Sequence, residues 1–394
     1  MKVLIKPIYF LAFLLLSGVA LASDNADFNA WKQTLYRQAI AEGVSESTAR
    51  KYIPSLKLLP SVVASDRKQP EFVSTFWDYV DTRLSEQRIA KGKMMMKRYP
   101  TWLKRLEERF GVPGQYLIAF WGLETNYGDT MGNTKTLDAL ATLAYDLRRR
   151  KFFTKELIAF LKILETEKFG TVYGSWAGAF GHFQFMPTTF LAYAVDADGN
   201  GTRNTIGNMP DAFASAANYL SKMGWNRYET WGREVVLPQW LDWNAVRQTK
   251  TVATWANEGV RLANGAGWPN EEMGIEADLI LPMGVSGPAF LVYPNFKRIM
   301  RWNKSELYAL TVAFLADILS DNWQGIYAER DASKLRHDDV MLMQTKLAEL
   351  GYYTGTIDGH LGPKTRQAIL NYQRQNALPQ DGYPSKQMIM LLTQ

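Results

Sequence analysis

The stretch Gly114-Gln-Tyr-Leu-Ile-Ala-Phe-Trp-Gly-Leu-Glu-Thr-Asn-Tyr-Gly128 places a carboxylate on an apolar helical face. Its apolar residues recur at intervals of three and four, which predicts a helix. On that helix four residues share one side: Leu117, Phe120, Trp121 and Glu124. Burial among apolar side chains disfavours the charged form of a carboxyl and raises its pKa, as a general acid near neutral pH requires. We expect Asn126–Gly128 to end the helix close to Glu124 and to open this face to a cleft.

A structural role is the alternative for Glu124, either as a helix cap or as the partner of an arginine in the core. An ordinary glycosidase needs a second carboxylate roughly 5 to 10 Å from the first. The nearest acids in the sequence are Asp129, beyond the predicted helix end, and Asp138, which we expect to open the next helix, where an acid is common. Neither of them is identified as a partner by its position in the sequence.

The composition narrows the chemistry that the chain can perform. Its 394 residues include 45 Lys and Arg against 39 Asp and Glu, no cysteine and three histidines. The lack of cysteine excludes disulfides, thiol nucleophiles and cysteinyl zinc sites, and three histidines leave little for a histidine-based metal hydrolase or a Ser-His-Asp triad. A net charge of +6 without a long basic run argues against nucleic acid as the main partner. The groups that remain for catalysis and binding are carboxylates, amides, hydroxyls and aromatic rings.

The first 22 residues are typical of a secretory signal peptide. Lys2 and Lys6 provide a positive n-region, Ile8–Leu16 a short apolar core, and Ala20-Leu-Ala22 an A-x-A cleavage site. A retained membrane anchor is the alternative, but the apolar stretch is shorter than the roughly 20 residues that span a bilayer. We therefore expect residues 1–22 to be removed and the mature protein to be exported and soluble, in the periplasm of a cell with two membranes.

Two folded parts are predicted in the rest of the chain. From Asp27 to about Trp323 the pattern is mostly helical, with strand-like stretches only at about 233–237 and 277–281. The charged stretch 329–338 is interpreted as a linker. Residues 339–394 predict a small three-helix module with a thin core.

The three helices of this module are predicted from its apolar stripe and its prolines. The stripe of the first helix consists of Val340, Met343, Leu347 and Leu350. Pro363 stands where a proline opens a second helix, and a third begins near Pro384.

Six motifs resemble those of the B-type lytic murein transglycosylases, in order between about Phe76 and Leu319. They are Trp121-Gly-Leu-Glu-Thr-Asn-Tyr-Gly128, Gly174-Ser-Trp-Ala-Gly-Ala-Phe-Gly181, Gln184-Phe-Met-Pro187, Tyr193-Ala-Val-Asp196, Ser215-Ala-Ala-Asn-Tyr219 and Arg301-Trp-Asn-Lys-Ser305. The resemblance implies a mainly α, lysozyme-like (goose-type) helical catalytic domain with minor β structure over residues 23–328. It also implies an enzyme, a peptidoglycan lyase that cleaves the β-1,4 bond between N-acetylmuramic acid and N-acetylglucosamine without water and leaves 1,6-anhydromuramoyl ends.

The implied mechanism needs a single protein carboxylate, and no cofactor is required for the chemistry. Glu124 would first protonate the leaving oxygen and then, as a carboxylate, take the proton from the muramoyl O6 while O6 closes on C1. By the same resemblance six residues would contact the substrate: Ser175, Gln184, Tyr219, Asn303, Tyr308 and Tyr79. Three residues depart from the family pattern. Trp302 stands where a tyrosine is frequent, and His182 and Phe183 occupy positions that vary or carry smaller residues in relatives. We expect His182 to be packed or at the surface; the alternative is that it points into the cleft and adds a titrating group.

The loop Asp196-Ala-Asp-Gly-Asn-Gly201 fits the opening of an EF-hand, with oxygen side chains at positions 1, 3 and 5 and glycine at position 6. The twelfth position is Gly207 instead of Glu, so the standard loop is broken. The resemblance nevertheless implies a structural calcium site, closed by a later acid. Its candidate ligands are Asp196, Asp198, Asn200, Thr202 through its carbonyl, and Asp211. A metal-free Asp/Gly/Asn turn is the alternative.

The C-terminal residues resemble a widespread peptidoglycan-binding domain. The matching motifs are Gln344-x-x-Leu347-x-x-x-Gly351-Tyr352-Tyr353 and Leu361-Gly362-x-x-Thr365. The resemblance implies that residues 339–394 tether the enzyme to the wall, which raises the local substrate concentration. An inert stabilising domain is the alternative.

Two other functions remain open at this level. A hydrolytic muramidase would use the same Glu124 but admit water, and a non-catalytic wall-binding scaffold would keep Glu124 as a structural acid. For partners, we expect peptidoglycan glycan strands and no nucleic acid, with proteins of cell-wall synthesis or division left open. The chain is expected to be a monomer.

Overall fold

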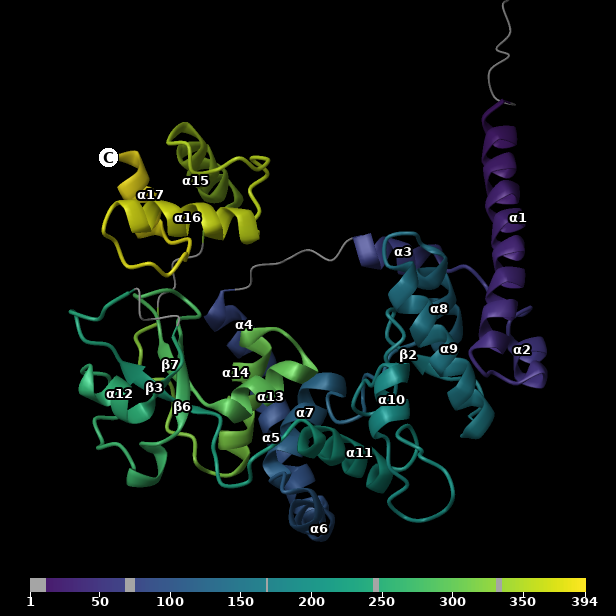
Figure 1. The fold of residues 1–394 in the computed structure, drawn as a ribbon, viewed down its shortest axis with the longest axis horizontal. Coiled ribbons are helices and arrows are strands. Elements are labelled where there is room, and N and C mark those ends of the chain that lie inside the picture. Colours follow the sequence, from purple (N-terminus) through teal and green to yellow (C-terminus); the bar gives the residue numbers. More distant parts are fainter. Residues whose placement is uncertain (1–11, 68–74, 168, 244–247, 331–334) are drawn as a thin grey trace, which may run out of the picture. The chain divides into compact units, whose positions relative to one another are not determined.

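The computed structural model describes residues 12–67, 75–167, 169–243, 248–330 and 335–394. By their contacts they divide into two units (Figure 1). Unit 1 comprises Met1–Gln69 and Thr130–Ser215, and unit 2 comprises Pro70–Asp129 and Ala216–Gln394. Residues 1–11 of the predicted signal peptide lie outside the described residues. None of the described helices combines the length and apolar character needed to cross a bilayer.

Unit 1 is mainly helical. Its elements are α1 (Ala12–Ala41), α2 (Glu46–Tyr52), α3 (Pro60–Arg67), β1 (Thr134–Lys135), α8 (Thr136–Tyr145), α9 (Arg150–Thr166), β2 (Tyr173–Gly174), α10 (Pro187–Tyr193) and the start of α11 (Met209–Lys222). Helices α8 and α9 pack along each other, and β1 pairs with β2 in an antiparallel ribbon. Asp138 lies in the first turn of α8, as predicted, and its Oδ1 accepts a 3.0 Å hydrogen bond from the Lys57 amide. This buried acid therefore holds the loop before α3.

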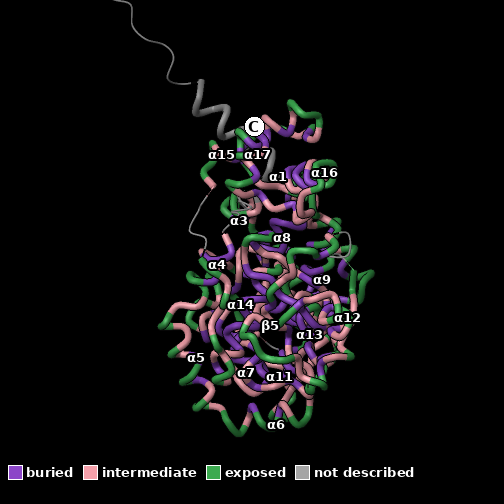
Figure 2. The backbone as a smooth tube through the Cα atoms, turned by 90° about the vertical axis from the view of Figure 1, so that its left-hand side faces the viewer, coloured by how far each residue is buried: buried purple, intermediate pink, exposed green. Residues whose placement is uncertain are grey.

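Six helices of unit 2, one of which carries the predicted carboxylate, pack in one cluster. They are α4 (Phe76–Arg83), α5 (Glu86–Arg98), α6 (Pro100–Phe110), α7 (Gly114–Thr125), α13 (Pro294–Trp302) and α14 (Glu306–Leu319). Helix α7 is the stretch that opened the sequence analysis, and it packs against α14 and α5. Both α7 and α14 are buried along most of their length (Figure 2). Such helices are apolar on more than one side because the core surrounds them.

Helix α7 ends through two consecutive left-handed residues, Asn126 at φ 51° and Tyr127 at φ 61°. This conformation is costly for residues other than glycine, so surrounding contacts must hold it. The Tyr127 hydroxyl donates a 2.9 Å hydrogen bond to the carbonyl of Arg88. A Cβ on Gly122 would lie 2.7 Å from the Tyr127 ring, so only glycine fits there. The predicted end of the helix at Asn126 is thus correct.

A five-stranded antiparallel sheet follows in unit 2, in the order β4-β6-β7-β3-β5. Its strands are β3 (Gly232–Val236), β4 (Lys250–Thr251), β5 (Arg261–Leu262), β6 (Glu276–Ile280) and β7 (Ala289–Val292), with α12 (Val252–Asn257) and a 3₁₀ turn (Asn270–Glu272) between them. The stretches predicted as strands correspond to β3 and β6. In the sheet's core the Trp255 indole donates a 3.0 Å hydrogen bond to the carbonyl of Ala277. All four residues of β7 are buried.

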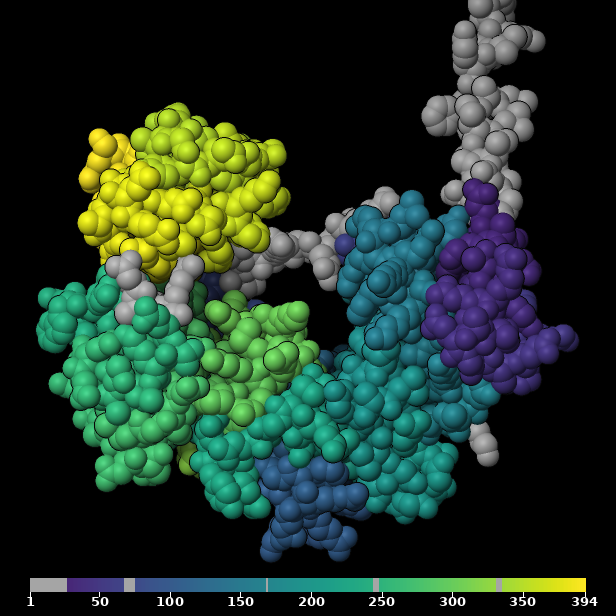
Figure 3. All heavy atoms as spheres, viewed as in Figure 1, coloured from purple at the N-terminus to yellow at the C-terminus, as the bar shows by residue number. Residues whose placement is uncertain are grey.

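The last three helices of unit 2 are α15 (His337–Glu349), α16 (Pro363–Gln375) and α17 (Lys386–Thr393). They form one compact lobe, yellow-green in the space-filling view (Figure 3). Three of the four predicted stripe residues are buried, but Leu350 is 52% exposed. That part of the prediction is wrong because α15 ends at Glu349, one residue before the stripe would have continued. The linker residues 331–334 lie outside the described residues.

Candidate active site

Glu124 lies in the last turn of α7, half-buried, and its carboxyl accepts a hydrogen bond from the Tyr308 hydroxyl. Burial raises the pKa of Glu124 to about 7, while the hydrogen bonds from Tyr308 and Trp302 and the charge of Arg83 lower it to a smaller extent. Removal of water from the carboxyl is the dominant cause, because the charged form loses most solvation. Glu124 can therefore exist as an acid and as a carboxylate at neutral pH.

Tyr308 is positioned by the turn between α13 and α14. The Asn303 side-chain oxygen accepts a 3.1 Å hydrogen bond from the Ser305 amide, and the Ser305 hydroxyl caps α14 by accepting one of 3.2 Å from the Tyr308 amide. Burial and the neighbouring Glu124 raise the pKa of Tyr308 well above its ordinary value. Tyr308 thus stays protonated at neutral pH and acts as a hydrogen-bond donor.

Trp302 supplies the second hydrogen bond to the Glu124 carboxyl. An indole has a single N–H donor, so the departure from tyrosine at this position retains a donor. The Trp302 ring lies 4.5 Å from that of Phe120 and 4.9 Å, edge to face, from that of Tyr219. The Tyr219 hydroxyl donates a 2.9 Å hydrogen bond to the carbonyl of Arg301. These contacts hold the Trp302 ring in place beside Glu124.

Helix α4 contributes Tyr79 and Arg83, which lie one turn apart on one face. The Arg83 guanidinium lies 5.3 Å from the centre of the Tyr79 ring. Burial raises the pKa of Tyr79 as it does that of Glu124, and the charge of Arg83 opposes both rises to a smaller extent. Tyr79 was a candidate from the sequence, whereas Arg83 was missed. The i, i+4 spacing from Tyr79 is the only sequence signal that could have indicated it.

Two other predicted substrate residues, Ser175 and Gln184, belong to unit 1. The Ser175 hydroxyl accepts a 3.1 Å hydrogen bond from the Ala179 amide and so closes a tight loop. Gln184 has a left-handed backbone, at φ 49°, and its amide nitrogen donates to the carbonyls of Met131, at 3.1 Å, and Gly181, at 2.9 Å. Burial lowers the pKa of the neighbouring His182, which favours its neutral form.

No carboxylate is among the described groups that shift the pKa of Glu124. Asp129 accepts a 3.0 Å hydrogen bond from the Asn126 side chain and forms a 2.6 Å ion pair with Lys91. Asp138 is engaged with the Lys57 amide in unit 1. The two nearest acids in the sequence therefore have structural partners of their own.

The predicted calcium loop brings three carboxylates together in unit 1. Oxygen atoms of Asp196, Asp198 and Asp211 lie within 4.8 Å of one another. Asp211 is completely buried and accepts 2.8 Å hydrogen bonds from the amides of Ala197 and Asn204. Asn200 lies in the same loop, where its side-chain oxygen accepts 2.9 and 2.6 Å hydrogen bonds from the amide and hydroxyl of Thr202. Convergent carboxylate oxygens are the ligands that a hard cation such as Ca²⁺ prefers.

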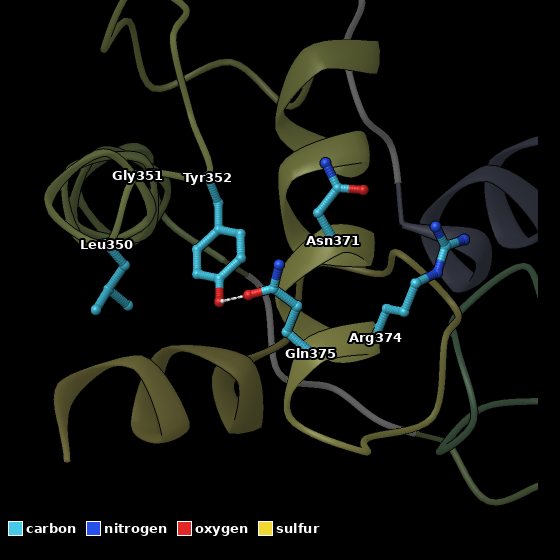
Figure 4. Close-up of a pocket in the computed structure, with 6 residues that line it drawn as sticks. All are labelled: Leu350, Gly351, Tyr352, Asn371, Arg374 and Gln375. Carbon is cyan, nitrogen blue, oxygen red and sulfur yellow. Dashed lines mark hydrogen bonds between the residues drawn. The ribbon is translucent and has the colours of Figure 1, made fainter.

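The C-terminal lobe carries a groove with a cavity volume of about 400 Å³ between the end of α15 and α16 (Figure 4). Its lining consists of Leu350, Gly351, Tyr352, Asn371, Arg374 and Gln375. Figure 4 shows the Tyr352 hydroxyl pointing at Gln375, to which it donates a 2.8 Å hydrogen bond. The exposure of Leu350, which contradicts the predicted stripe, thus makes this residue part of the groove.

Two families match this chain. Residues 27–317 match the family described as Transglycosylase SLT domain, and residues 336–392 match a putative peptidoglycan binding domain. The membrane-bound lytic murein transglycosylase B of Escherichia coli (strain K12) is 32% identical over 240 residues. That alignment covers 58% of this chain, and this chain spans 63% of the length of the E. coli protein.

Solved structures extend the similarity. SltB3 from Pseudomonas aeruginosa, in complex with NAG-anhNAM-pentapeptide, has a TM-score of 0.85 at 37% identity, over 93% of this chain and 99% of that one. The E. coli lytic transglycosylase Slt35, in complex with calcium, has a TM-score of 0.63 at 27% identity, over 73% of this chain and 92% of that one.

Proposed function

The chain belongs to the transglycosylase SLT domain family, whose members act on peptidoglycan, and from this premise we propose the reaction that it performs. It cleaves the β-1,4 bond between N-acetylmuramic acid and N-acetylglucosamine without water and forms 1,6-anhydromuramoyl ends. The relatives support this reaction, since SltB3 was solved with an anhydromuramoyl ligand. The observation that carries the assignment to a residue is the half-buried Glu124 with its raised pKa.

Glu124 acts first as the acid and then as the base. With a pKa of about 7, about half of the molecules carry the proton at neutral pH. The proton passes to the glycosidic oxygen as the bond from that oxygen to C1 of the muramoyl residue breaks. The muramoyl O6 then bonds to C1, and its proton passes to the Glu124 carboxylate. The carboxyl is thereby restored, so the cycle needs no second acid and no water.

The substrate is held by hydroxyls, amides and aromatic rings, which suit a neutral sugar because rings stack on its faces and polar groups bond its edges. In unit 2 the proposed contacts are Tyr79, Tyr219, Asn303 and Tyr308. In unit 1 they are Ser175 and Gln184. The hydrogen bond from Tyr308 to Glu124 supports a second role for Tyr308, which is to orient the acid.

Digestion of sacculi followed by mass spectrometry tests the reaction. We expect the wild type to release muropeptides that end in 1,6-anhydromuramic acid, one water lighter than hydrolysis products, and Glu124→Gln to release none. Asp129→Asn serves as the matched control, because it neutralises a nearby acid that has its own partners. Reducing-end products would make the protein a muramidase, and no products from the wild type would favour the non-catalytic scaffold.

The C-terminal lobe, residues 339–394, holds the enzyme on the cell wall. The linker 329–338 separates this lobe from the catalytic domain, residues 23–328. The lobe's match to the peptidoglycan-binding family supports this role. Deleting the residues after Asp331 should weaken binding to sacculi but leave cleavage of short soluble glycans intact. Arg374→Ala, in the groove, should weaken binding more than Lys364→Ala, which removes a charge from the same helix outside the groove. Equal effects of the two substitutions would mean that the groove does not take part in binding to the wall.

Asp196, Asp198 and Asp211 hold a structural calcium ion, with Asn200 and the Thr202 carbonyl completing the shell. The three convergent carboxylates and the calcium-bound neighbour support this site. Calcium should neutralise the mutual repulsion of the acids and raise the melting temperature. Asp198→Asn should abolish that rise because the exposed Asp198 loses its charge without a buried contact being lost. An unchanged melting temperature at millimolar calcium would refute the site.

The protein works in the periplasm after removal of residues 1–22. The pattern of Lys2, Lys6 and Ala20-Leu-Ala22 supports export. Amino-terminal sequencing of the protein from a periplasmic extract should begin at Ser23. A start at Met1 in a membrane fraction would instead identify a retained anchor.

A further inference from the structure

A second cavity of unit 2 lies outside the Glu124 site. It has a volume of about 500 Å³ and is bounded by β3, the loop after β5 and the segment that follows α14. Asp317 at its wall and Tyr308 beside Glu124 are nine residues apart on α14. This separation is about 13 Å along the helix and about half a turn around it, so the two side chains project from opposite faces. The cavity is therefore distinct from the catalytic site and lies in the size range of small-ligand sites.

Aromatic rings form one side of this cavity. Trp323 packs on the buried Phe314 with ring centres 5.1 Å apart, and Trp231 lies 5.5 Å from Phe314, edge to face. Trp323 remains half-exposed, so part of its ring is available to a ligand. Stacking of a flat apolar face on an indole is a common mode of binding for ligands that carry C–H groups on one face.

Side-chain amides and a carboxyl form the other side. The Asn264 amide donates to the Gln324 oxygen at 3.4 Å, and the Tyr327 hydroxyl donates to the same oxygen at 3.0 Å. Asp317 accepts a 2.8 Å hydrogen bond from the Trp231 indole at Oδ2, and each carboxyl oxygen can accept more than one hydrogen bond. Burial raises the pKa of Asp317 to about 6. The wall thus offers both donors and acceptors within a few ångströms of an aromatic face.

Arg233 and Glu234, which also line the cavity, already have partners within the protein, which favours a neutral ligand at these two residues. Arg233 forms an ion pair with Glu272, and Glu272 also accepts a 2.7 Å hydrogen bond from the Tyr293 hydroxyl. The carboxylate of Glu234 accepts 2.8 Å hydrogen bonds from the amides of Tyr327 and Ala328. A ligand that pairs with Arg233 or Glu234 would have to displace one of these partners, whereas a neutral polyhydroxylated ligand that bonds to the amides and to Asp317 would not.

We propose that this cavity is a second saccharide site, which binds one N-acetylhexosamine unit of a glycan strand away from the bond that is cleaved. Trp323 stacks on the sugar ring, Asn264 and Gln324 bond its hydroxyl and acetamido groups, and Asp317 accepts from a hydroxyl. The choice of a peptidoglycan sugar as ligand rests on the proposed function. The site itself rests on the cavity's own residues, and it gives the enzyme a second hold on the strand.

Tryptophan indole NMR of the full chain tests the site. The chain has 13 tryptophans, few enough for individual assignment by Trp→Phe substitution. The protein carries Glu124→Gln so that the probe, triacetylchitotriose, stays intact. The indole of Trp231 reports on the cavity and that of Trp302 on the Glu124 site. We expect the Trp231 resonance to shift in a saturable manner.

A variant of the cavity rim separates binding from indirect effects. Asn264→Ala with Gln324→Ala removes two exposed amides, so the fold should be retained, and it should weaken the Trp231 response at least tenfold while the Trp302 response is unchanged. A Trp231 resonance that stays still at concentrations that saturate Trp302, or that responds equally in the rim variant, overturns the proposal. A shift at Trp231 without one at Trp302 would support the cavity and count against the Glu124 site.

Discussion

Replacing Tyr308 by phenylalanine should move the pH dependence of cleavage. The substitution removes the hydroxyl that donates to the Glu124 carboxyl and retains the ring that packs near Phe120. In the folded protein this hydrogen bond lowers the pKa of Glu124, because it stabilises the carboxylate more than the neutral acid. Without this hydrogen bond, less remains to counteract the effect of burial, so the pKa of Glu124 should rise above its value of about 7.

The size of the shift follows from the two kinds of hydrogen bond. A bond to a charged acceptor contributes about 1.5–3 kcal/mol and one between neutral groups about 0.5–1.5 kcal/mol. The difference of about 1 to 1.5 kcal/mol corresponds to about one pKa unit, since one unit equals about 1.4 kcal/mol. We therefore expect a pKa of about 8 for Glu124 in Tyr308→Phe.

The assay is the initial rate of release of anhydromuropeptides from sacculi, measured across pH at low substrate. The catalytic form is the protonated Glu124, so the rate falls as the pH rises through its pKa, and the position of this limb reports the pKa in the free enzyme. The limb should lie near pH 7 in the wild type and about one unit higher in the variant. The maximal rate should fall as well, because the acid is less well oriented.

Tyr79→Phe provides the matched control. It removes a hydroxyl from the same site, but Tyr79 has no hydrogen bond to Glu124 and is uncharged at neutral pH, so the limb should keep its position even if the rate falls. The reasoning is refuted if Tyr308→Phe leaves the limb in place or moves it to lower pH. It is also refuted if both substitutions move the limb equally.

Three further predictions concern charge at or near the site. Because folding raises the pKa of Glu124 from about 4.5 to about 7, the folded state binds more protons between these values, and stability should fall as the pH rises through this window by at most about 3 kcal/mol. Glu124→Gln should remove that fall, as urea unfolding at pH 4.5 and pH 8 can measure. Asp138→Asn should keep cleavage, since its oxygen can still accept from the Lys57 amide, and a loss of the reaction in folded protein would contradict the single-carboxylate mechanism. Arg83→Gln should move the pH–rate limb upward by a few tenths of a unit at low salt and less at high salt, because the exposed guanidinium is screened; a downward shift would be inconsistent with its charge.

Local patterns in the sequence predicted the elements whose geometry depends on near neighbours. The spacing of apolar residues located α7 and placed Glu124 on one face with Leu117, Phe120 and Trp121, because residues three and four apart on a helix share a face in any fold. The same pattern located β3 and β6 to within one residue, and the ordered motifs identified the transglycosylase family and its lysozyme-like fold, which the comparisons confirm.

Short strands were not predicted, because their conformation depends on partners far away in the chain. Strands β4 and β5 have two residues each, too few for an alternating pattern, and exist through pairing with β6 and β3. Strand β7 is buried on both faces, so it lacks alternation as well. Leu350 was misplaced because periodicity does not show where a helix ends.

The environment of Glu124 required the tertiary structure. The sequence by itself determined the family, the single candidate acid and the helix that carries it, because these depend on residue identity and local spacing. Which groups surround that acid depended on the packing of α4 and α14 against α7, at separations of about 40 and 180 residues along the chain. Desolvation, the Tyr308 and Trp302 hydrogen bonds and the Arg83 charge arise only from those contacts, and they set the pKa on which the proposed chemistry depends.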